Sequence, residues 1–137
     1  MITKEELIYA TTKIVRVKAI AKEKGIATSF FYKTPSGNYY LVSNKHFYQD
    51  TNEKDFVFRI LIDKDGDYGE LKLDINATPI IHNIYDIGAI CINSAIEKIK
   101  SDNVKIKNKI ITQEDIIPLT EENFSSIENA YVIGKWF

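Results

Sequence analysis

The sequence is poor in residue types that would mark a secreted or membrane-bound protein. Cys91 is the one cysteine in 137 residues, so no disulfide can form within the chain, and a reducing compartment such as the cytoplasm is favoured. Cys91 lies in the apolar run IGAICIN and is interpreted as a small core residue. No segment approaches the roughly 20 consecutive apolar residues that cross a bilayer. The N-terminus MITKEELIYA also lacks the apolar core of a signal peptide, so we expect a cytoplasmic protein without membrane contact.

An excess of charge of one sign is also missing. The chain has 18 Lys and Arg against 19 Asp and Glu, for a formal net charge of -1. A nucleic acid would select a basic excess, so we do not expect one as a partner. The one local basic stretch lacks the interleaved aromatic residues that stack on bases, and it is interpreted as a solvated face. Its lysines are Lys98, Lys100, Lys105, Lys107 and Lys109.

The chain does contain enough apolar residues for one core. Hydrophobic residues make up 45% of the sequence and aromatic residues 12%. A chain of this length fits one domain, residues 1–137, and folding buries roughly two thirds of the surface that the unfolded chain exposes. No repeat, low-complexity tract or linker-like change of composition divides it.

Apolar and polar residues alternate through most of the chain, as is typical of β-strands. Turn residues in TPSG, 34–37, and KDGD, 64–67, separate two pairs of such runs, which predicts two β-hairpins. The predicted strands span residues 13–20, 26–33, 38–44, 55–63, 68–76, 86–93 and 130–137.

Helices are expected only at the margins of this pattern. A short N-terminal helix is predicted from Thr3, and short helices or turns at 94–103, with Ser94 as the N-cap, and at 120–129. Tandem hairpins with marginal helices predict an all-β fold, an antiparallel Greek-key barrel of about six strands whose closure would hide the edge strands.

Two acidic or histidine-containing stretches raise the question of a metal. Asp63, Asp65 and Asp67 surround Gly66, but the glycine and a terminal glutamate are not at the positions of a calcium-binding loop, so a solvated hairpin turn is preferred. His82 lies four residues before Asp86, but the residues between them read as a loop and no third zinc ligand is evident. We therefore predict neither a metal nor a cofactor.

His46 and Asp86 both lie at strand ends. His46 follows the apolar run YYLV and the polar corner Ser43-Asn44-Lys45, and Asp86 immediately precedes IGAICIN. One complete hairpin separates them in the sequence. Because strand ends converge at the rim of a small closed sheet, these two residues are expected to be neighbours.

These stretches resemble the trypsin-like serine peptidases of the chymotrypsin fold. The resemblance is carried by GIATSFFY and YYLVSNKHF, by IHNIYDIGAICIN and, more weakly, by IENAYVIGKWF. By this resemblance His46 corresponds to the catalytic general base and Asp86 to the carboxylate that orients it. Ala27 and Ser29 stand where the family has glycines, and Phe47 replaces the cysteine that follows the histidine in extracellular members.

The resemblance covers most of the chain but only half of the family's fold, which has two barrels. The nucleophilic serine of the family lies in the second barrel, in a glycine-framed loop that also forms the oxyanion hole. No such loop is present here, and none of the serines has that frame. They are Ser29, Ser36, Ser43, Ser94, Ser101, Ser125 and Ser126.

Three functions fit these observations. The resemblance implies the His/Asp-bearing N-terminal half of an intracellular trypsin-like serine peptidase, inactive alone, which would act on a peptide or protein once a second barrel completes it. The alternative is a degenerate pseudoprotease barrel that binds a protein partner or a second copy through exposed aromatics, Trp136 and Phe137 among them. An unrelated small β-barrel that binds a small ligand is the third, and it predicts that His46 and Asp86 lie far apart.

Overall fold

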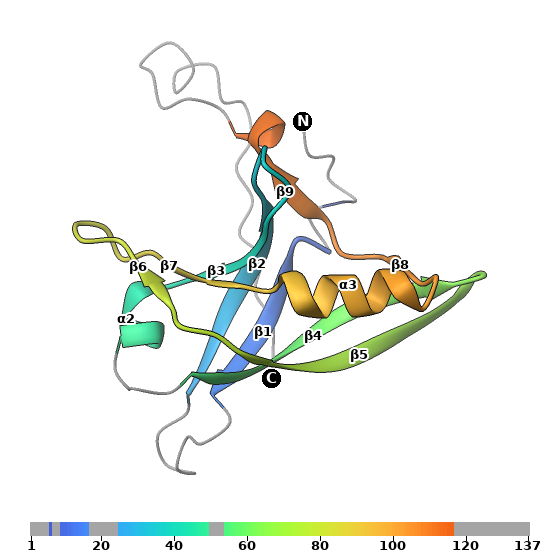
Figure 1. Ribbon diagram of the computed structural model, residues 1–137, viewed down its shortest axis with the longest axis horizontal. Coiled ribbons are helices and arrows are strands. Elements are labelled where there is room, and N and C mark those ends of the chain that lie inside the picture. The colour runs from blue at the N-terminus through green and yellow to red at the C-terminus, as the bar shows by residue number, and fades with distance from the viewer. Residues whose placement is uncertain (1–5, 7–8, 17–24, 50–53, 117–137) are drawn as a thin grey trace.

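The computed structural model describes residues 6, 9–16, 25–49 and 54–116 (Figure 1). Within these ranges the chain is mostly antiparallel β-sheet with two α-helices, which confirms the all-β class. Most of the predicted N-terminal helix, the helix or turn predicted at 120–129 and the strand predicted at 130–137 lie outside the described residues.

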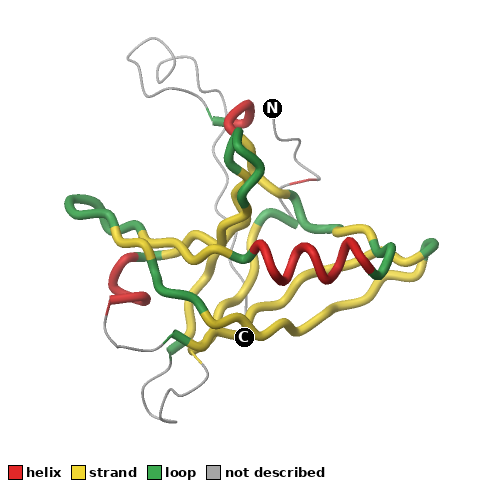
Figure 2. Tube along the Cα trace, in the orientation of Figure 1, coloured by secondary structure: helices red, strands yellow, loops and turns green. Residues whose placement is uncertain are grey.

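Nine strands form one sheet in the described part of the chain (Figure 2). Five of the predicted strands before residue 94 appear with bounds within two residues of those expected, and the sixth, at 13–20, is described as far as Arg16. The strands are β1 Thr11–Arg16, β2 Ile26–Lys33, β3 Tyr39–Ser43, β4 Asp55–Lys64, β5 Asp67–Asn76, β6 Ile80–Ile81, β7 Gly88–Cys91, β8 Lys105–Ile106 and β9 Ile110–Thr112.

Both predicted hairpins are present, as β2–β3 and β4–β5. The β4–β5 turn places Asp65 at φ 52° and Gly66 at φ 89°, the left-handed conformations that a tight two-residue hairpin turn requires. The Gly66 N–H donates to Asp63 Oδ1 at 2.9 Å, so this carboxylate closes the turn. The acidic stretch is thus the hairpin turn that the sequence predicted.

The sheet does not close into a barrel through hydrogen bonds. Its strands run in the order β5-β4-β1-β2-β3-β7-β6, with β8 beside β4 and β9 parallel to β2. The two ends of this order, β5 and β6, are consecutive in the chain and separated by residues 77–79. Pro79 has no backbone N–H to donate, and β6 has only two residues, so hydrogen bonding is interrupted where closure was expected.

Helix α3, Asn93–Ser101, covers the sheet and contacts β3, β5 and β8 (Figure 1). Its buried residues Ala95, Ile96 and Ile99 lie on one face, as the helical period requires. The predicted cap Ser94 is inside the helix instead. Asn93, which begins the helix, accepts the Tyr39 N–H at 2.7 Å through Oδ1 and so joins the helix to β3.

The core lies between the curved sheet and the two helices. Phe31 of β2 and Phe58 of β4 meet edge to face with ring centroids 5.9 Å apart, and both are essentially inaccessible to solvent. Aliphatic side chains surround this pair. The cluster of buried residues comprises Ile14, Phe31, Leu41, Phe47, Tyr48, Phe56, Phe58, Ile60, Ile75, Ile90, Ile92, Ala95, Ile96 and Ile99.

Two features differ from the sequence analysis in detail. Cys91, expected in the core, is only half-buried as a free thiol. Of the lysines expected on a solvated face, Lys107 lies 5.0 Å from the ring centroids of both Tyr9 and Tyr68, and Lys109 pairs with Glu6 at 3.2 Å. Lys107 therefore covers aromatic rings as well as carrying charge, and Lys109 is ion-paired. Neither α3 nor the other helix of the described residues is long and apolar enough to cross a bilayer.

Candidate functional site

Strand pairing brings the predicted site residues together. β3 and β7 run antiparallel with Ser43 opposite Gly88, so the end of β3 lies beside the start of β7. His46 follows β3 by three residues and Asp86 precedes β7 by two. The two side chains are therefore neighbours although 40 residues separate them in the chain.

The Asp86 carboxylate accepts hydrogen bonds from both the backbone and the side chain of His46. The His46 N–H donates to Oδ1 at 3.0 Å, and the imidazole Nδ1 lies 2.8 Å from Oδ2 and 3.1 Å from Oδ1. An ionised carboxylate can only accept, so Nδ1 carries the proton. Asn44 adds a longer contact, Nδ2 to Oδ2 at 3.4 Å. In the neutral ring, Nε2 then keeps the free lone pair.

The histidine stands on a short helix that the sequence analysis missed. Helix α2, Lys45–Gln49, begins at the last residue of the predicted polar corner. The two residues after His46 anchor it, because Phe47 and Tyr48 are buried and form an aromatic cluster with Phe56 of β4. The Tyr48 hydroxyl also donates to the Leu41 carbonyl at 2.8 Å, and burial raises its pKa. His46 is thus held to the exposed side of α2.

Gly88 lets α2 approach β7 closely. A Cβ atom at this position would lie 2.6 Å from Tyr48 Cδ2, closer than side-chain atoms tolerate, and 3.2 Å from Ile81 Cδ1, a tight contact. The absence of a side chain at Gly88 therefore permits the close approach of the helix that carries His46 to the strand that follows Asp86. A glycine inside an apolar strand is a sequence signal for such an approach, and it could have been recognised beforehand.

The pair is open to solvent, whereas the corresponding acid of the trypsin-like peptidases is buried. The side chain of His46 is 67% exposed and that of Asp86 54% exposed. The pKa of the Asp86 carboxyl still lies below its ordinary value of 3.8, first because the His46 N–H donates to it and then because of the imidazole and Asn44. Exposure screens the attraction between the two side chains, so the pair by itself adds little stability.

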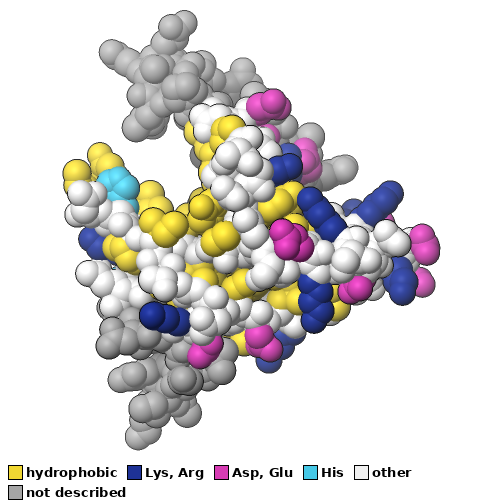
Figure 3. Space-filling model, in the orientation of Figure 1, with side chains coloured by type: hydrophobic (Ala, Val, Ile, Leu, Met, Phe, Trp, Pro, Cys, Tyr) yellow, Lys and Arg dark blue, Asp and Glu magenta, His cyan; other side chains and the backbone are white. Residues whose placement is uncertain are grey.

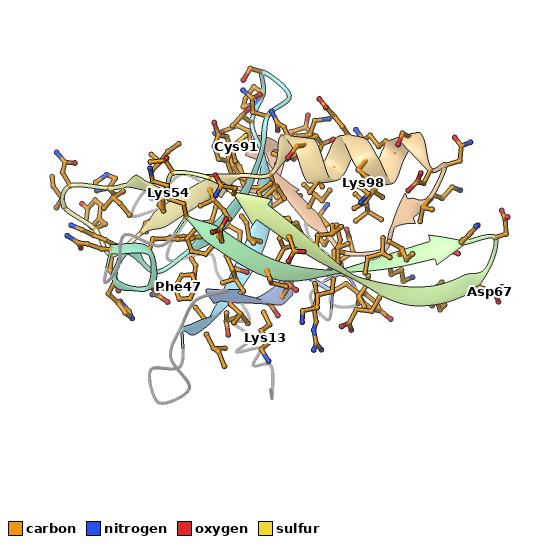
Figure 4. All side chains as sticks on the ribbon, turned by 60° about the horizontal axis from the view of Figure 1, so that its bottom comes forward. Lys13, Phe47, Lys54, Asp67, Cys91 and Lys98 are labelled. Atoms are coloured by element: carbon orange, nitrogen blue, oxygen red, sulfur yellow. The ribbon has the colours of Figure 1, made fainter. Side chains whose placement is uncertain are left out.

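The residues weighed as metal ligands do not converge. His82 Nδ1 accepts the backbone N–H groups of Ile84 and Tyr85, each at 3.0 Å. The described ranges hold no group of three or more His, Cys, Asp or Glu side chains that could bind a metal ion. The acidic turn lies far from the His46–Asp86 pair. Figure 4 shows Asp67, at the hairpin tip, on the opposite side of the molecule from Phe47, which follows His46 on α2.

The serine closest in sequence to His46 is committed to the sheet. Ser43 is buried at the end of β3, and its hydroxyl donates to the Thr28 carbonyl at 2.8 Å. Ser29 is likewise buried and donates to the Thr12 carbonyl at 3.2 Å. Both hydroxyls therefore satisfy backbone groups. Ser125 and Ser126 lie outside the described residues.

An apolar surface adjoins the pair. Of the large apolar side chains that are exposed in the described residues, four lie on β6 and in the β6–β7 loop: Ile80, Ile84, Tyr85 and Ile87. Figure 3 shows apolar side chains gathered at this end of the molecule. Asp86 lies within the same segment, so this apolar surface and the carboxylate share one loop.

Comparison with protein-family models, with curated proteins and with solved structures finds no significant match to this chain.

Proposed function

We propose that this chain is the His/Asp-bearing half of a trypsin-like serine peptidase. One observation carries the proposal: the His46 imidazole and backbone N–H both bond the Asp86 carboxylate, with Nδ1 2.8 Å from Oδ2. The backbone that carries the pair is anchored by buried residues two positions further along the chain, Tyr48 after His46 and Gly88 after Asp86. A single cysteine agrees with a reducing, cytoplasmic setting.

The arrangement supplies two of the three groups that acyl transfer needs. With its proton held on Nδ1 by Asp86, the His46 ring accepts a proton at Nε2 from a serine hydroxyl as the serine oxygen attacks the scissile carbonyl. The imidazolium then gives that proton to the leaving amine when the C–N bond breaks. Water releases the acyl group by the same two proton transfers. Asp86 remains ionised and stabilises the imidazolium throughout.

The strand order supports half of a double barrel. The order begins at β5 and ends at β6, and the chain itself joins them through Ala77, Thr78 and Pro79. A sheet whose first and last strands are consecutive in the chain must curl back on itself, as an antiparallel barrel does. A single bent strand containing β5 and β6 would then complete a six-stranded Greek-key barrel.

The exposure of the pair agrees with a site that needs a second part. A second barrel packed at this end would bring its serine to Nε2 and remove the carboxylate from water, which strengthens its interaction with the imidazolium. The third function, a small-ligand barrel, predicted a wide separation of His46 and Asp86, and the 2.8 Å distance argues against it.

The apolar surface of Ile80, Ile84, Tyr85 and Ile87 favours a second candidate function. A degenerate barrel that has lost its partner half would retain this surface as a docking site for another protein. The two candidates differ in what the gene encodes beyond residue 137, because only the peptidase requires a glycine-framed serine downstream.

The test is to read the coding sequence beyond Phe137 and to treat its full product with a fluorophosphonate, which loses fluoride to an activated serine. We expect a downstream serine that is labelled, while chain 1–137 alone is not. His46→Ala and Asp86→Asn should slow labelling of the full product by roughly a thousandfold or more, and Asp74→Asn, on the exposed face of β5, should not. A stop codon at residue 138, or a full product that resists the probe, would contradict the peptidase and leave the binding module.

A further inference from the structure

Asp86 lies in a closed loop whose shape sets the direction of its carboxylate. A backbone hydrogen bond joins the first and last residues of the loop: the His82 N–H donates to the Ile87 carbonyl at 3.0 Å. Within it, the Ile87 N–H donates to the Tyr85 carbonyl at 2.8 Å, so Asp86 is the central residue of a three-residue γ-turn. Its φ is not among the positive values of the described residues, which identifies the common inverse form.

The His82 imidazole is solvent-exposed, and it caps two backbone N–H groups of this loop. Its Nδ1 accepts hydrogen bonds from the N–H groups of residues two and three positions further on, Ile84 and Tyr85, each at 3.0 Å. Asparagine and aspartate side chains stabilise turns by this same pattern of bonds. The imidazole also lies against the Tyr85 ring with centroids 5.1 Å apart. Two backbone donors that precede Asp86 directly are therefore fixed by one side chain.

We infer that His82 is a positioning residue for the His46–Asp86 pair: it acts as the acceptor that closes the 82–87 loop and thereby aims the Asp86 carboxylate at His46 Nδ1. The inference rests on the proposed function only for its consequence in catalysis. The positioning of Asp86 by His82 involves only residues that the structure describes, and it does not depend on a serine.

Three variants of His82 distinguish its role as a hydrogen-bond acceptor from its role in packing. His82→Asn places a carbonyl oxygen on Cγ, where Nδ1 is attached now, and keeps the acceptor. His82→Leu has nearly the shape of asparagine and no acceptor. His82→Phe keeps a ring against Tyr85 and also lacks the acceptor. Since His82 is solvent-exposed, none of these changes removes a core contact.

Two NMR readouts report on the pair itself. The ¹⁵N shifts of His46 give the fraction of neutral rings protonated at Nδ1, and ¹³C titration of the Asp86 carboxyl gives its midpoint. In each His82 variant His46 is the only histidine left, because the sequence has two. Losing two hydrogen bonds of ordinary strength should lower the ratio of closed to open loop roughly tenfold.

In His82→Leu and His82→Phe we therefore expect the Asp86 midpoint to rise toward 3.8 and the His46 ring to lose its preference for Nδ1–H, while His82→Asn retains both wild-type readouts. If the leucine and phenylalanine variants keep the wild-type tautomer and midpoint, His82 does not position the carboxylate. If the asparagine variant changes as much as the leucine variant, the acceptor is not the cause. Either result would overturn the inference.

These readouts are independent of peptidase activity, so the two proposals can fail separately. A positioned pair in a protein that no fluorophosphonate labels would contradict the peptidase alone. A labelled full-length product in which His82→Leu changes neither the tautomer nor the rate of labelling would contradict the positioning role alone.

Discussion

At the scale of single residues, the site depends on how many donors one carboxylate collects. Asp86 is exposed, yet the His46 N–H, the His46 imidazole and the Asn44 amide all point to it. The backbone donor lowers the pKa of Asp86 most. This matters because the backbone donor persists when the imidazole is removed, so the orientation of the acid is a property of α2 as well as of the histidine.

The pKa of Asp86 leads to a prediction about acid pH. Because its folded pKa lies below 3.8, ionised Asp86 stabilises the fold above that pH, and this contribution is lost as the pH falls through the folded pKa. We expect the ¹³C titration midpoint of Asp86 to lie below 3.8 in the wild type and, owing to the remaining backbone N–H, in His46→Ala. In urea unfolding, the difference in the free energy of unfolding between Asp86→Asn and the wild type should become smaller as the pH falls through this acid range. A wild-type midpoint at or above 3.8 would contradict the geometry.

At the scale of secondary-structure elements, the packing of α2 on β7 sets the site. Tyr48 on α2 is buried against Gly88 on β7, and its hydroxyl also bonds β3 through the Leu41 carbonyl. One side chain thus joins the two strands whose ends carry His46 and Asp86. Any change that moves this ring also moves the histidine relative to the acid.

Gly88→Ala tests this packing. The added methyl would lie 2.6 Å from Tyr48 Cδ2, so we expect a loss of about 1–3 kcal/mol in the free energy of unfolding and a weakened His46–Asp86 contact. Urea unfolding and the ¹⁵N tautomer of His46 measure the two effects. Gly69→Ala is the matched control, because there a Cβ atom meets only Ile62 at 3.8 Å and a change within about 0.5 kcal/mol is expected. Equal effects at the two glycines would show that α2 packing is not limiting.

The strand pattern was predictable from local periodicity, and α2 was not. Alternation placed β2, β4 and β5 within a residue of their bounds, since each runs eight or more residues and its side chains alternate in exposure over part of that length. Helix α2 has only five residues, too few for a helical pattern of apolar residues to be recognised in the sequence. It forms because Phe47 and Tyr48 pack into an aromatic cluster of the tertiary structure. β6, β8 and β9 have two or three residues each and exist only through their pairing partners.

At the scale of the whole molecule, the site is attached to one hydrophobic core, which includes the residues that directly follow His46. Phe58 of β4 is fully buried against Phe31, and Phe56 on the same strand continues the core to the aromatic cluster that includes Phe47 and Tyr48 of α2. The apolar residues near the pair, by contrast, face solvent. The molecule therefore has a buried apolar core and an exposed apolar end where the proposed second half or partner would bind.

Phe58→Ala tests the weight of this core. Removing the ring leaves a cavity that the sheet cannot fill, so we expect a loss of about 3–5 kcal/mol, a large part of the roughly 5–15 kcal/mol that stabilises a domain. Ile84→Ala, at a side chain 76% exposed, should cost much less. Both are measured by chemical denaturation. A small effect at Phe58 would mean that the core described here is not the cooperative unit of folding.

The sequence by itself determined the strand class, the two hairpins and the placement of an imidazole and a carboxylate at strand ends, because periodicity and turn chemistry are local properties of the chain. Tertiary structure alone decided that Asp86 receives a backbone N–H as well as the His46 ring, that Gly88 admits Tyr48, that His82 accepts two N–H groups of its own loop, and that the acid remains exposed. These contacts join segments up to 40 residues apart or depend on the exact curl of one loop. Their energies depend on the distances between atoms and on burial, and a local sequence pattern predicts neither.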